Sequence, residues 1–420
     1  MPDTDESRSA RELITDRRFG PYFFGNLFSN AGNWFQNIAA GVLVFEITGS
    51  NTKVGLISAI QFGAILVFTL WAGKLSDRVN RRRMLLFSQI LAWLGAVGLA
   101  TTILVIGDDN ISNPLPVYLA TAVIGTGYAL SLPALQALVP ALVRPGDLKQ
   151  AIALNSVTFN LARAFGPALA GWVVAAFGAG VAFGVNALSF LPLIIVLTLI
   201  RQRDVDMSGE SDGSISESFR IAFGDRRILV PLTGTLAIGF GSDPVNTLTP
   251  AIADLFGEDR AFVGLLVASF GAGAALAAFR LGTFVKSMEA ERAGAYGLGV
   301  LAVGMATLAV APNRWIALGA LAVAGVGFIG AITALNSAIQ DRIAEEVRGR
   351  VMAIWSVFFL GVRPVAALLD GAIADAVSVR AGIAVPALVA GGMAVWLSSK
   401  VGSHGPIPGS RREQAEQLPF

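Results

Sequence analysis

Long apolar runs, separated by short polar connections, extend from Pro21 to Ser399. A helix that spans a bilayer needs about 20 apolar residues, and these runs have that length. They do not alternate polar and apolar residues as the strands of a membrane β-barrel do. The pattern predicts an all-α polytopic membrane protein with twelve transmembrane helices, at 21–46, 53–76, 84–107, 115–138, 148–176, 179–200, 227–252, 261–284, 293–311, 314–337, 348–373 and 381–399.

Basic residues predict the orientation of these spans. Of the 31 Lys and Arg residues, 25 fall on the side that carries both termini and four on the opposite side, while Arg163 and Arg363 fall inside spans. Short loops rich in Lys and Arg stay in the cytoplasm. We therefore expect a multi-pass protein of the plasma membrane with both termini in the cytoplasm.

One long polar segment divides the predicted spans into two sets of six. The second span of each set opens on a similar sequence, VGLI from Val54 and VGLL from Val263, at an offset of 209 residues. Repeated halves with a site between them are typical of secondary transporters. The predicted organisation is a cytoplasmic tail at 1–20, a six-helix bundle at 21–200, a cytoplasmic linker at 201–226, a second six-helix bundle at 227–400 and a cytoplasmic tail at 401–420.

Composition excludes several classes of function. The chain is 54% apolar and 14% charged, whereas a soluble domain carries roughly 25% charged residues. It has no cysteine, its single histidine is His404 in the C-terminal tail, and its carboxylates are not clustered, so we expect no catalytic residue, no metal and no cofactor. A GxGxxG match from Gly325 lies inside an apolar run and indicates helix packing, so we expect no nucleotide. The net charge of +2 fits membrane orientation, so we expect no nucleic acid.

Several motifs resemble one transporter superfamily. The sequence GKLSDRVNRR from Gly73 resembles the GxxxDRxxRR motif of the major facilitator superfamily. The sequence GPALAG, from Gly166 through Pro167 to Gly171, resembles the proline/glycine motif of its drug antiporters. The stretches 29–34, 45–50 and 348–352 resemble a bacterial exporter branch that includes macrolide and enterobactin exporters. The resemblance implies two pseudo-symmetric bundles in a bacterial inner membrane, and it implies that Pro167 and Gly171 let spans 5 and 8 approach closely and seal the interface.

The resemblance also implies a gate at the cytoplasmic end of span 2. In this fold, span 2 faces the start of span 11, and a carboxylate is favoured near a helix N-terminus and near arginine. Asp77 would therefore hold the cytoplasmic side closed. The alternative is a tight turn whose arginines serve only orientation. The gate residues would be Gly73, Asp77, Arg78, Arg81, Arg82, Arg348 and Arg350.

Span 1 contains four asparagines, at positions 26, 30, 33 and 37. Their spacings of 4, 3 and 4 residues place the four amide side chains on one face of a helix. Amides that face lipid are costly, so this face must meet protein or a water-filled cavity. We expect a cavity wall for the cargo, and the alternative is hydrogen bonding between helices. Amides take up no proton, so coupling to protons needs other residues. The expected cavity residues are Asn26, Asn30, Asn33, Asn37, Tyr128 and Phe240.

Charged residues inside spans are candidates for that coupling. Asp243 precedes Pro244, and proline breaks a helix. A break at membrane depth is tolerated where it lines a cavity, so Asp243 is the first candidate for carrying a proton, and the alternative is a capping or structural role. Asp370 and Glu46 are rivals, but both fall close to outer span ends, where a solvated carboxylate needs no special explanation. Intramembrane arginines need partners, so Arg163 and Arg363 would pair with these carboxylates or bind an anionic cargo.

Together these features favour a secondary active transporter. We expect a proton-coupled exporter of small amphiphilic molecules or drugs that works by alternating access as a monomer. The alternative is a dedicated siderophore, lipid or metabolite exporter. A membrane enzyme or signalling protein is a distant third, because the sequence offers no nucleophile–base set.

Overall fold

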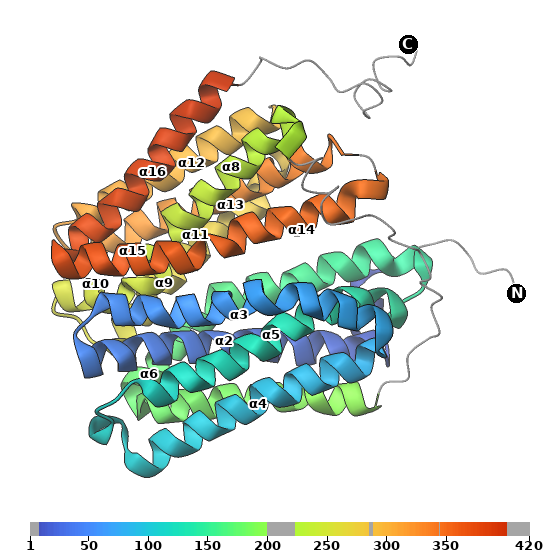
Figure 1. Ribbon diagram of the computed structural model, residues 1–420, viewed down its shortest axis with the longest axis horizontal. Coiled ribbons are helices and arrows are strands. Elements are labelled where there is room, and N and C mark those ends of the chain that lie inside the picture. The colour runs from blue at the N-terminus through green and yellow to red at the C-terminus, as the bar shows by residue number, and fades with distance from the viewer. Residues whose placement is uncertain (1–7, 200–222, 285–288, 344, 401–420) are drawn as a thin grey trace, which may run out of the picture. The chain divides into compact units, whose positions relative to one another are not determined.

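The computed structural model describes residues 8–199, 223–284, 289–343 and 345–400, and within these ranges the regular structure is helical (Figure 1). The first part of the chain contains α1 (Ala10–Ile14), α2 (Phe19–Thr48), α3 (Asn51–Arg78), α4 (Arg81–Ile106), η1 (Asp108–Asn110), α5 (Leu115–Leu142), η2 (Pro145–Asp147) and α6 (Leu148–Leu199). The second part contains α8 (Arg226–Ser242), α9 (Pro244–Thr247), α10 (Thr249–Leu255), α11 (Arg260–Phe284), α12 (Ala290–Ala309), α13 (Arg314–Gln340), α14 (Glu345–Gly361), α15 (Arg363–Ala376) and α16 (Val379–Lys400).

Every predicted span overlaps a helical segment. Spans 5 and 6 form the single element α6, which bends at Gly178, where φ is +85°. Glycine adopts this left-handed region without the steric cost that a Cβ would bring. Spans 7 and 11 are each divided into shorter helices, at Asp243 and at Val362. The all-α polytopic fold expected from the sequence is confirmed.

Length and composition alone identify nine membrane-crossing helical stretches in the part of the chain that is described. Helix α2 is not among them. It carries the four amides that lower its hydropathy, although most of its length is buried. Polar residues inside a span are energetically costly and mark functional positions. The low hydropathy of α2 is therefore consistent with the cavity wall expected from its amides.

Local sequence explains several helix ends. Asn80, before α4, accepts a hydrogen bond from the backbone N–H of Arg83, and Asn313, before α13, accepts bonds from the N–H groups of Trp315 and Ile316. These side chains satisfy donors that a helix N-terminus leaves unpaired. Helix α2 ends at Gly49, where φ is +59°, a common conformation for a glycine that terminates a helix.

Contacts divide the chain into two compact units. Unit 1 consists of residues 1–208 and 250–268, and unit 2 consists of residues 209–249 and 269–420. In unit 1, α2 packs along α6, and α5 packs against both α3 and α4 (Figure 1). Helix α10 and the first part of α11 group with this unit, whereas the sequence assigns 227–400 to one bundle. Glycine contacts between α6 and α11, described below, account for that grouping.

Unit 2 is built around α12, which packs against α13 and α16, while α8 packs against α13, α14 and α16. A Cβ at Gly325 would overlap the carbonyl oxygen of Phe270 in α11, and one at Gly327 would overlap the backbone of Leu301 in α12. Small residues at such crossings let helix backbones approach closely. These glycines therefore serve helix packing.

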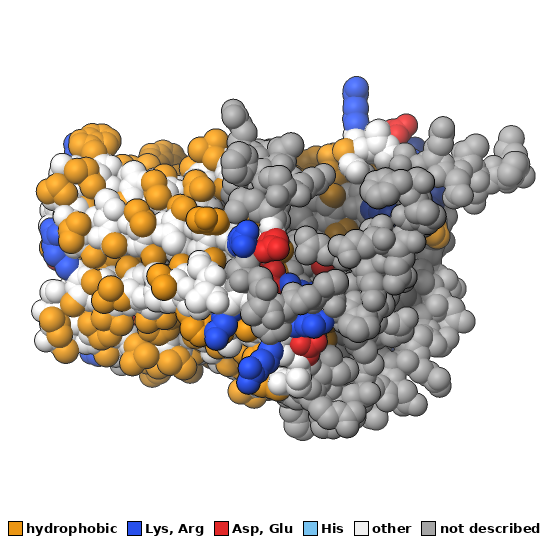
Figure 2. Space-filling view, turned by 90° about the horizontal axis from the view of Figure 1, so that it is seen from above, with side chains coloured by type: hydrophobic (Ala, Val, Ile, Leu, Met, Phe, Trp, Pro, Cys, Tyr) orange, Lys and Arg blue, Asp and Glu red, His pale blue; other side chains and the backbone are white. Residues whose placement is uncertain are grey.

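The outer surface of the described helices is apolar. Val303 is 61% exposed, Leu388 is 74% exposed and Val395 is 73% exposed. On the coloured part of the face shown in Figure 2, hydrophobic side chains predominate, and charged side chains lie mainly near the middle of the view and at its left margin. A soluble protein rarely exposes so much contiguous apolar surface, whereas helices that contact lipid require it.

Candidate functional site

Two broken helices of unit 2 meet at their breaks. Asp243 ends α8 and begins α9, and Pro244 is the first residue of α9. Val362 precedes α15, whose first two residues are Arg363 and Pro364. Proline cannot donate the backbone hydrogen bond that a continuous helix needs, so each break is encoded locally.

Gly239 of α8 allows the two breaks to lie close together. A Cβ at this position would lie 2.5 Å from Cγ1 of Val362 and 2.9 Å from the carbonyl oxygen of Phe359. Any larger residue would push the helices apart. Gly239, four residues before Asp243, therefore lets the chain of span 11 lie next to span 7.

This arrangement brings together two buried carboxylates. Asp243 is 1% exposed and Asp370 is 0% exposed. Asp243 interacts electrostatically both with Asp370 and with the guanidinium of Arg363. The Arg363 guanidinium also lies 5.1 Å from the ring centroid of Phe359, a cation–π geometry. The two carboxylates that were expected to compete for one role therefore lie close enough for the charge of one to affect the other.

The carboxylates differ in their hydrogen bonds. Oδ2 of Asp243 accepts a 2.7 Å hydrogen bond from the hydroxyl of Thr247. Among the described residues, no donor reaches Oδ1 of Asp243 or either oxygen of Asp370. Burying a carboxylate without donors is strongly unfavourable unless its charge is neutralised. A proton or a bound cation would neutralise one of the two carboxylates, and Arg363 would balance the charge of the other.

Thr247 was not predicted as a functional residue, although its position carries a signal. It follows Asp243 by four residues, which places both side chains on one helical face. Its hydroxyl is buried, with 0% of Thr247 exposed. Gly239 was not singled out either, because its role depends on the approach of a helix distant in sequence.

The amides of α2 divide into different environments. Nδ2 of Asn26 donates to Oδ1 of Asn155 at 2.8 Å and to the hydroxyl of Thr158 at 3.2 Å, both in α6. Asn26 therefore joins two helices of unit 1. Asn30, Asn33 and Asn37 follow on the same face and are half-buried.

Other expected cavity residues belong to different units. Tyr128 lies in α5 of unit 1 and Phe240 lies in α8 of unit 2, and both are half-buried. Phe240 is three residues before Asp243, which places it close to the break of span 7 on its own helix. These aromatic residues are suited to apolar contacts with a small molecule.

Only one member of the expected gate has a described side chain. The side chains of Gly73, Asp77, Arg78, Arg81, Arg348 and Arg350, and also that of Arg163, lie outside the described residues. Arg82 donates from Nε to the carbonyl oxygen of Leu197 and from Nη2 to that of Thr198. These carbonyls end α6, so Arg82 caps a helix C-terminus, where cations are favoured.

The GPALAG motif lies in tight contact with its neighbours. A Cβ at Gly166 would lie 2.7 Å from Cδ1 of Trp34 in α2, and Gly166 and Pro167 are buried. A Cβ at Gly171 would lie 2.5 Å from the Cα of Gly264 in α11. The motif thus provides small residues where α6 meets α2 and the first part of α11, all within unit 1.

An ion pair near the ends of three elements was not expected. The Arg260 guanidinium, at the start of α11, donates from Nε to Oε1 of Glu46 at 2.6 Å. Its Nη1 lies 4.0 Å from Oδ2 of Asp108. Asp108 itself accepts bonds from the backbone N–H groups of Ala179 at 2.5 Å and Gly180 at 3.1 Å, just after the bend in α6. Sequence reasoning took Glu46 for a solvated carboxylate, because its partner lies far along the chain.

Comparisons with known proteins add to this geometry. The family described as transmembrane secretion effector matches residues 14–416. Enterobactin exporter EntS of Salmonella paratyphi A is 28% identical over 362 residues, covering 82% of this chain and 82% of that protein. The protein of the same name from Shigella boydii serotype 18 has the same identity and coverage.

Solved structures show the same fold. The nucleoside transporter NupG has a TM-score of 0.73 at 10% identity, covering 93% of this chain and 98% of that chain. A bacterial homologue of the iron transporter ferroportin, in an inward-facing state, has a TM-score of 0.71 at 15% identity, and the likeness covers 93% of this chain and 100% of that chain. At such low identity the likeness establishes the fold alone.

Proposed function

Because the chain belongs to the transmembrane secretion effector family of the major facilitator superfamily and is a secondary transporter that exports small molecules, we propose that proton entry drives its export of an amphiphilic cargo. We further propose that both termini face the cytoplasm of a bacterial inner membrane and that the protein works as a monomer. The half-buried amides and aromatic residues of α2, α5 and α8 would contact the cargo.

The buried pair Asp243 and Asp370 carries this proposal. The two carboxylates interact with each other, and oxygens on both have no donor among the described residues. Like-charged groups at such a site disfavour simultaneous ionisation, so the pair would hold a proton in one state of the transporter. Arg363 would balance the charge that remains.

Breaks at Asp243 and Val362 support a role in the transport cycle. Broken helices near membrane depth are typical of binding sites in transporters, because the interruption exposes polar backbone groups to a cavity. Proton release from the pair would change the electrostatic balance with Arg363. We propose that this change is coupled to the rearrangement that reverses access to the cargo site.

A latch at Asp77 would complete the cycle. By resemblance to the superfamily motif, the Asp77 carboxylate would bind Arg348 or Arg350 near the N-terminus of α14 when the cytoplasmic side is closed. Close packing of Gly171 would seal α6 against α11 during the same movement. These two roles are proposals that rest on the motifs.

Everted membrane vesicles with an imposed pH gradient test the coupling. Asp243→Asn and Asp370→Asn each keep the shape of the carboxylate but cannot release a proton, so we expect both to lose gradient-driven dye accumulation and retain downhill transport. Asp254→Asn on α10, where the carboxylate is exposed, is the matched control and should transport normally. Gradient-driven accumulation at the wild-type rate in the Asp243→Asn/Asp370→Asn double variant would contradict the proposal.

A dedicated siderophore exporter is the second candidate, favoured by the similarity to enterobactin exporters. In that case Arg363 would contact an anionic cargo. The same vesicles, supplied with enterobactin and with amphiphilic dyes in competition, distinguish the two functions. Saturable transport of enterobactin that dyes do not inhibit would favour the dedicated carrier, whereas mutual inhibition would favour a broad cargo range.

A further inference from the structure

The two buried carboxylates of unit 2 lie in different local structures. Asp243 lies at the break between α8 and α9, whereas Asp370 lies inside the continuous helix α15. Helix α16 packs tightly against this part of α15, because a Cβ at Gly382 would lie 2.8 Å from the carbonyl oxygen of Asp370 and 3.0 Å from the Cβ of Ala374. With 0% of Asp370 exposed, its carboxylate is enclosed by the protein and has no contact with water.

Two groups that favour a negative charge act on Asp243. Its Oδ2 accepts the 2.7 Å hydrogen bond from Thr247, and the guanidinium of Arg363 attracts it electrostatically. A hydrogen-bond donor and a cation both stabilise the ionised form of a carboxylate. In the described part of the chain no donor reaches Asp370, and the charge that acts on it is the like charge of Asp243. Asp243 is therefore the better anion of the two.

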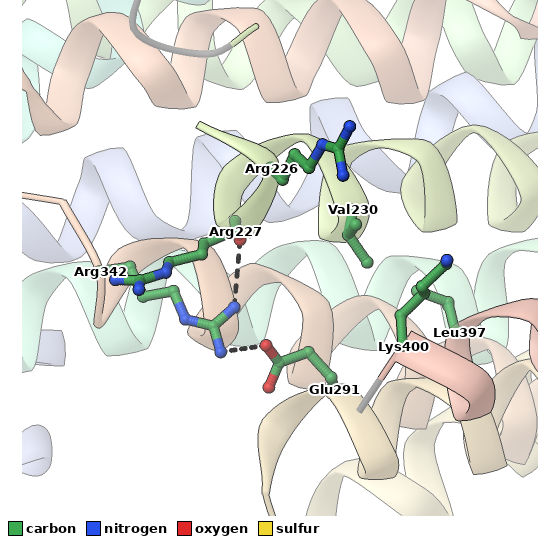
Figure 3. A pocket seen from close by; sticks show the side chains of 7 residues that line it. All are labelled: Arg226, Arg227, Val230, Glu291, Arg342, Leu397 and Lys400. Carbon is green, nitrogen blue, oxygen red and sulfur yellow. Dashed lines mark hydrogen bonds and ion pairs between the residues drawn. The ribbon is translucent and has the colours of Figure 1, made fainter. Parts of the chain in front are cut away.

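Another carboxylate of the same unit shows what a stable charge requires. Oε1 of Glu291, on α12, pairs with Nη2 of Arg342, whose Nη1 donates to the carbonyl oxygen of Arg227 at 3.1 Å (Figure 3). The Glu291 side chain is also 19% exposed, so water reaches it. Asp370 has neither such a partner nor such exposure. A negative charge on Asp370 is therefore far more costly than one on Glu291.

A single proton on Asp370 would serve both buried carboxylates. A protonated carboxyl group has an O–H donor, and Oδ1 of Asp243 accepts no hydrogen bond from the described residues. With Asp370 neutral, the charges of Asp243 and Arg363 cancel, whereas with Asp370 ionised one buried negative charge remains uncompensated. We propose that Asp370 is the residue that carries the transported proton and that Thr247 is a positioning residue that keeps Asp243 ionised.

Proton transport by Asp370 rests on the coupling proposed above, and it gives the two carboxylates different tasks. Loss of the proton from Asp370 creates a buried charge that exposure to water or a new cationic partner must offset. Deprotonation therefore favours a state of the transporter in which Asp370 is no longer enclosed. Asp243 stays ionised and keeps its interaction with Arg363 in both states.

Infrared spectroscopy of the purified full-length protein at neutral pH detects the proton. A protonated carboxyl group has a carbonyl stretching band that ionised carboxylates lack. We expect this band in the wild type, and we expect Asp370→Asn to lose it. Asp254→Asn, which changes an exposed carboxylate, is the matched control and should keep the band. Absence of the band from the wild type, or its persistence in Asp370→Asn, would overturn the assignment.

Dicyclohexylcarbodiimide locates the proton, because it reacts with protonated carboxyl groups in apolar surroundings and spares carboxylates. Peptide mass spectrometry of the modified protein should find roughly ten-fold or more adduct on Asp370 than on Asp243, since a hydrogen bond to a charged group corresponds to at least such a factor. Thr247→Val removes the hydroxyl and should shift the adduct toward Asp243. Thr247→Ser keeps a hydroxyl and should restore the wild-type ratio. A ratio that Thr247→Val leaves unchanged would contradict the role of Thr247.

Transport in everted vesicles, measured beside the adduct, separates this inference from the proposed coupling. Gradient-driven transport by a wild-type protein that is modified mainly on Asp243 would preserve the coupling and overturn the assignment to Asp370. Modification on Asp370 in a protein that does not respond to an imposed pH gradient would support the site of the proton and overturn its transport. Gradient-driven transport together with modification on Asp370 supports both.

Discussion

Gly171 of α6 and Gly264 of α11 lie so close together that a Cβ on Gly171 would be 2.5 Å from the Cα of Gly264. The relationship is reciprocal, because a Cβ on Gly264 would be 2.6 Å from the Cα of Gly171 and from the carbonyl oxygen of Pro167. Backbone atoms cannot move aside as a flexible side chain can. The contact therefore depends on glycine at both positions.

Gly171→Ala should destabilise the protein and impair export. Overpacking costs about 1–3 kcal/mol, which exceeds the gain of roughly 1 kcal/mol in helix propensity when alanine replaces glycine. Thermal unfolding in detergent and dye efflux from cells measure the two effects. Gly184→Ala is the matched control, because nothing lies within 4 Å of a Cβ at this position of the same helix. Wild-type stability and efflux in Gly171→Ala would refute the packing argument.

Exchanging the charges of Glu46 and Arg260 tests the ion pair between α2 and α11. The side chains are 38% and 32% exposed, so breaking the pair should cost no more than about 1 kcal/mol. Glu46→Arg and Arg260→Glu should each lower the melting temperature, and the double exchange should recover part of the loss. Recovery is expected to be incomplete, because Asp108 lies 4.0 Å from Arg260 and would repel a glutamate there. Strict additivity of the two single variants would show that the pair contributes nothing.

Docking of the N-terminal segment should depend on pH. Asp147 is 2% exposed and accepts two 2.8 Å hydrogen bonds from Arg8, one from its backbone N–H and one from Nε. Burial alone would raise the pKa of Asp147, but the hydrogen bonds from Arg8 outweigh it and the pKa is lowered. The stabilisation is therefore complete above about pH 4, where an unfolded aspartate ionises, and is lost as the pH falls through the lower folded value.

Hydrogen exchange of α1 measures this docking. Asp147→Asn should weaken it by about 1.5–3 kcal/mol, the usual contribution of hydrogen bonds to charged groups, and should reduce the loss of protection on acidification. The remaining loss is expected from Glu12 and Asp16, whose pKa values are also lowered by their hydrogen bonds. Arg11→Gln, an exposed neighbour on α1, should behave as wild type. Unchanged protection of α1 in Asp147→Asn would contradict the assignment.

Asp77→Asn tests the proposed latch. The amide keeps the size of the side chain but removes the charge, so the closed cytoplasmic side should lose roughly 1.5–3 kcal/mol of charge-assisted bonding. Cells that overproduce the variant at the wild-type level should lose drug resistance. Arg83→Gln, which changes an exposed residue after the GxxxDRxxRR motif, is the control. Full resistance of the Asp77→Asn strain would leave the loop with a role in orientation only.

The sequence by itself determined the helices and one of their interruptions. Apolar runs of bilayer length predicted the positions of the spans, and Pro244 predicted the break of span 7, because hydropathy and the missing N–H of proline are local properties. The break of span 11 before Pro364 was not predicted, although proline gives the same local signal there. The face of α2 that carries Asn26, Asn30, Asn33 and Asn37 also followed from helical spacing. The same local reasoning identified Asp243, Arg363 and Asp370 one by one.

Only the tertiary structure decided which of these residues meet. It brought Asp370 to Asp243, directed Asn26 to Asn155, gave Glu46 the partner Arg260 and set Gly171 against Gly264. Each pair joins helices that are far apart in sequence, and helix periodicity says which face a residue occupies but not which neighbour covers it. The energy of a buried polar group or of a close backbone contact depends on that neighbour, because it changes when the neighbouring atoms move by a few tenths of an ångström.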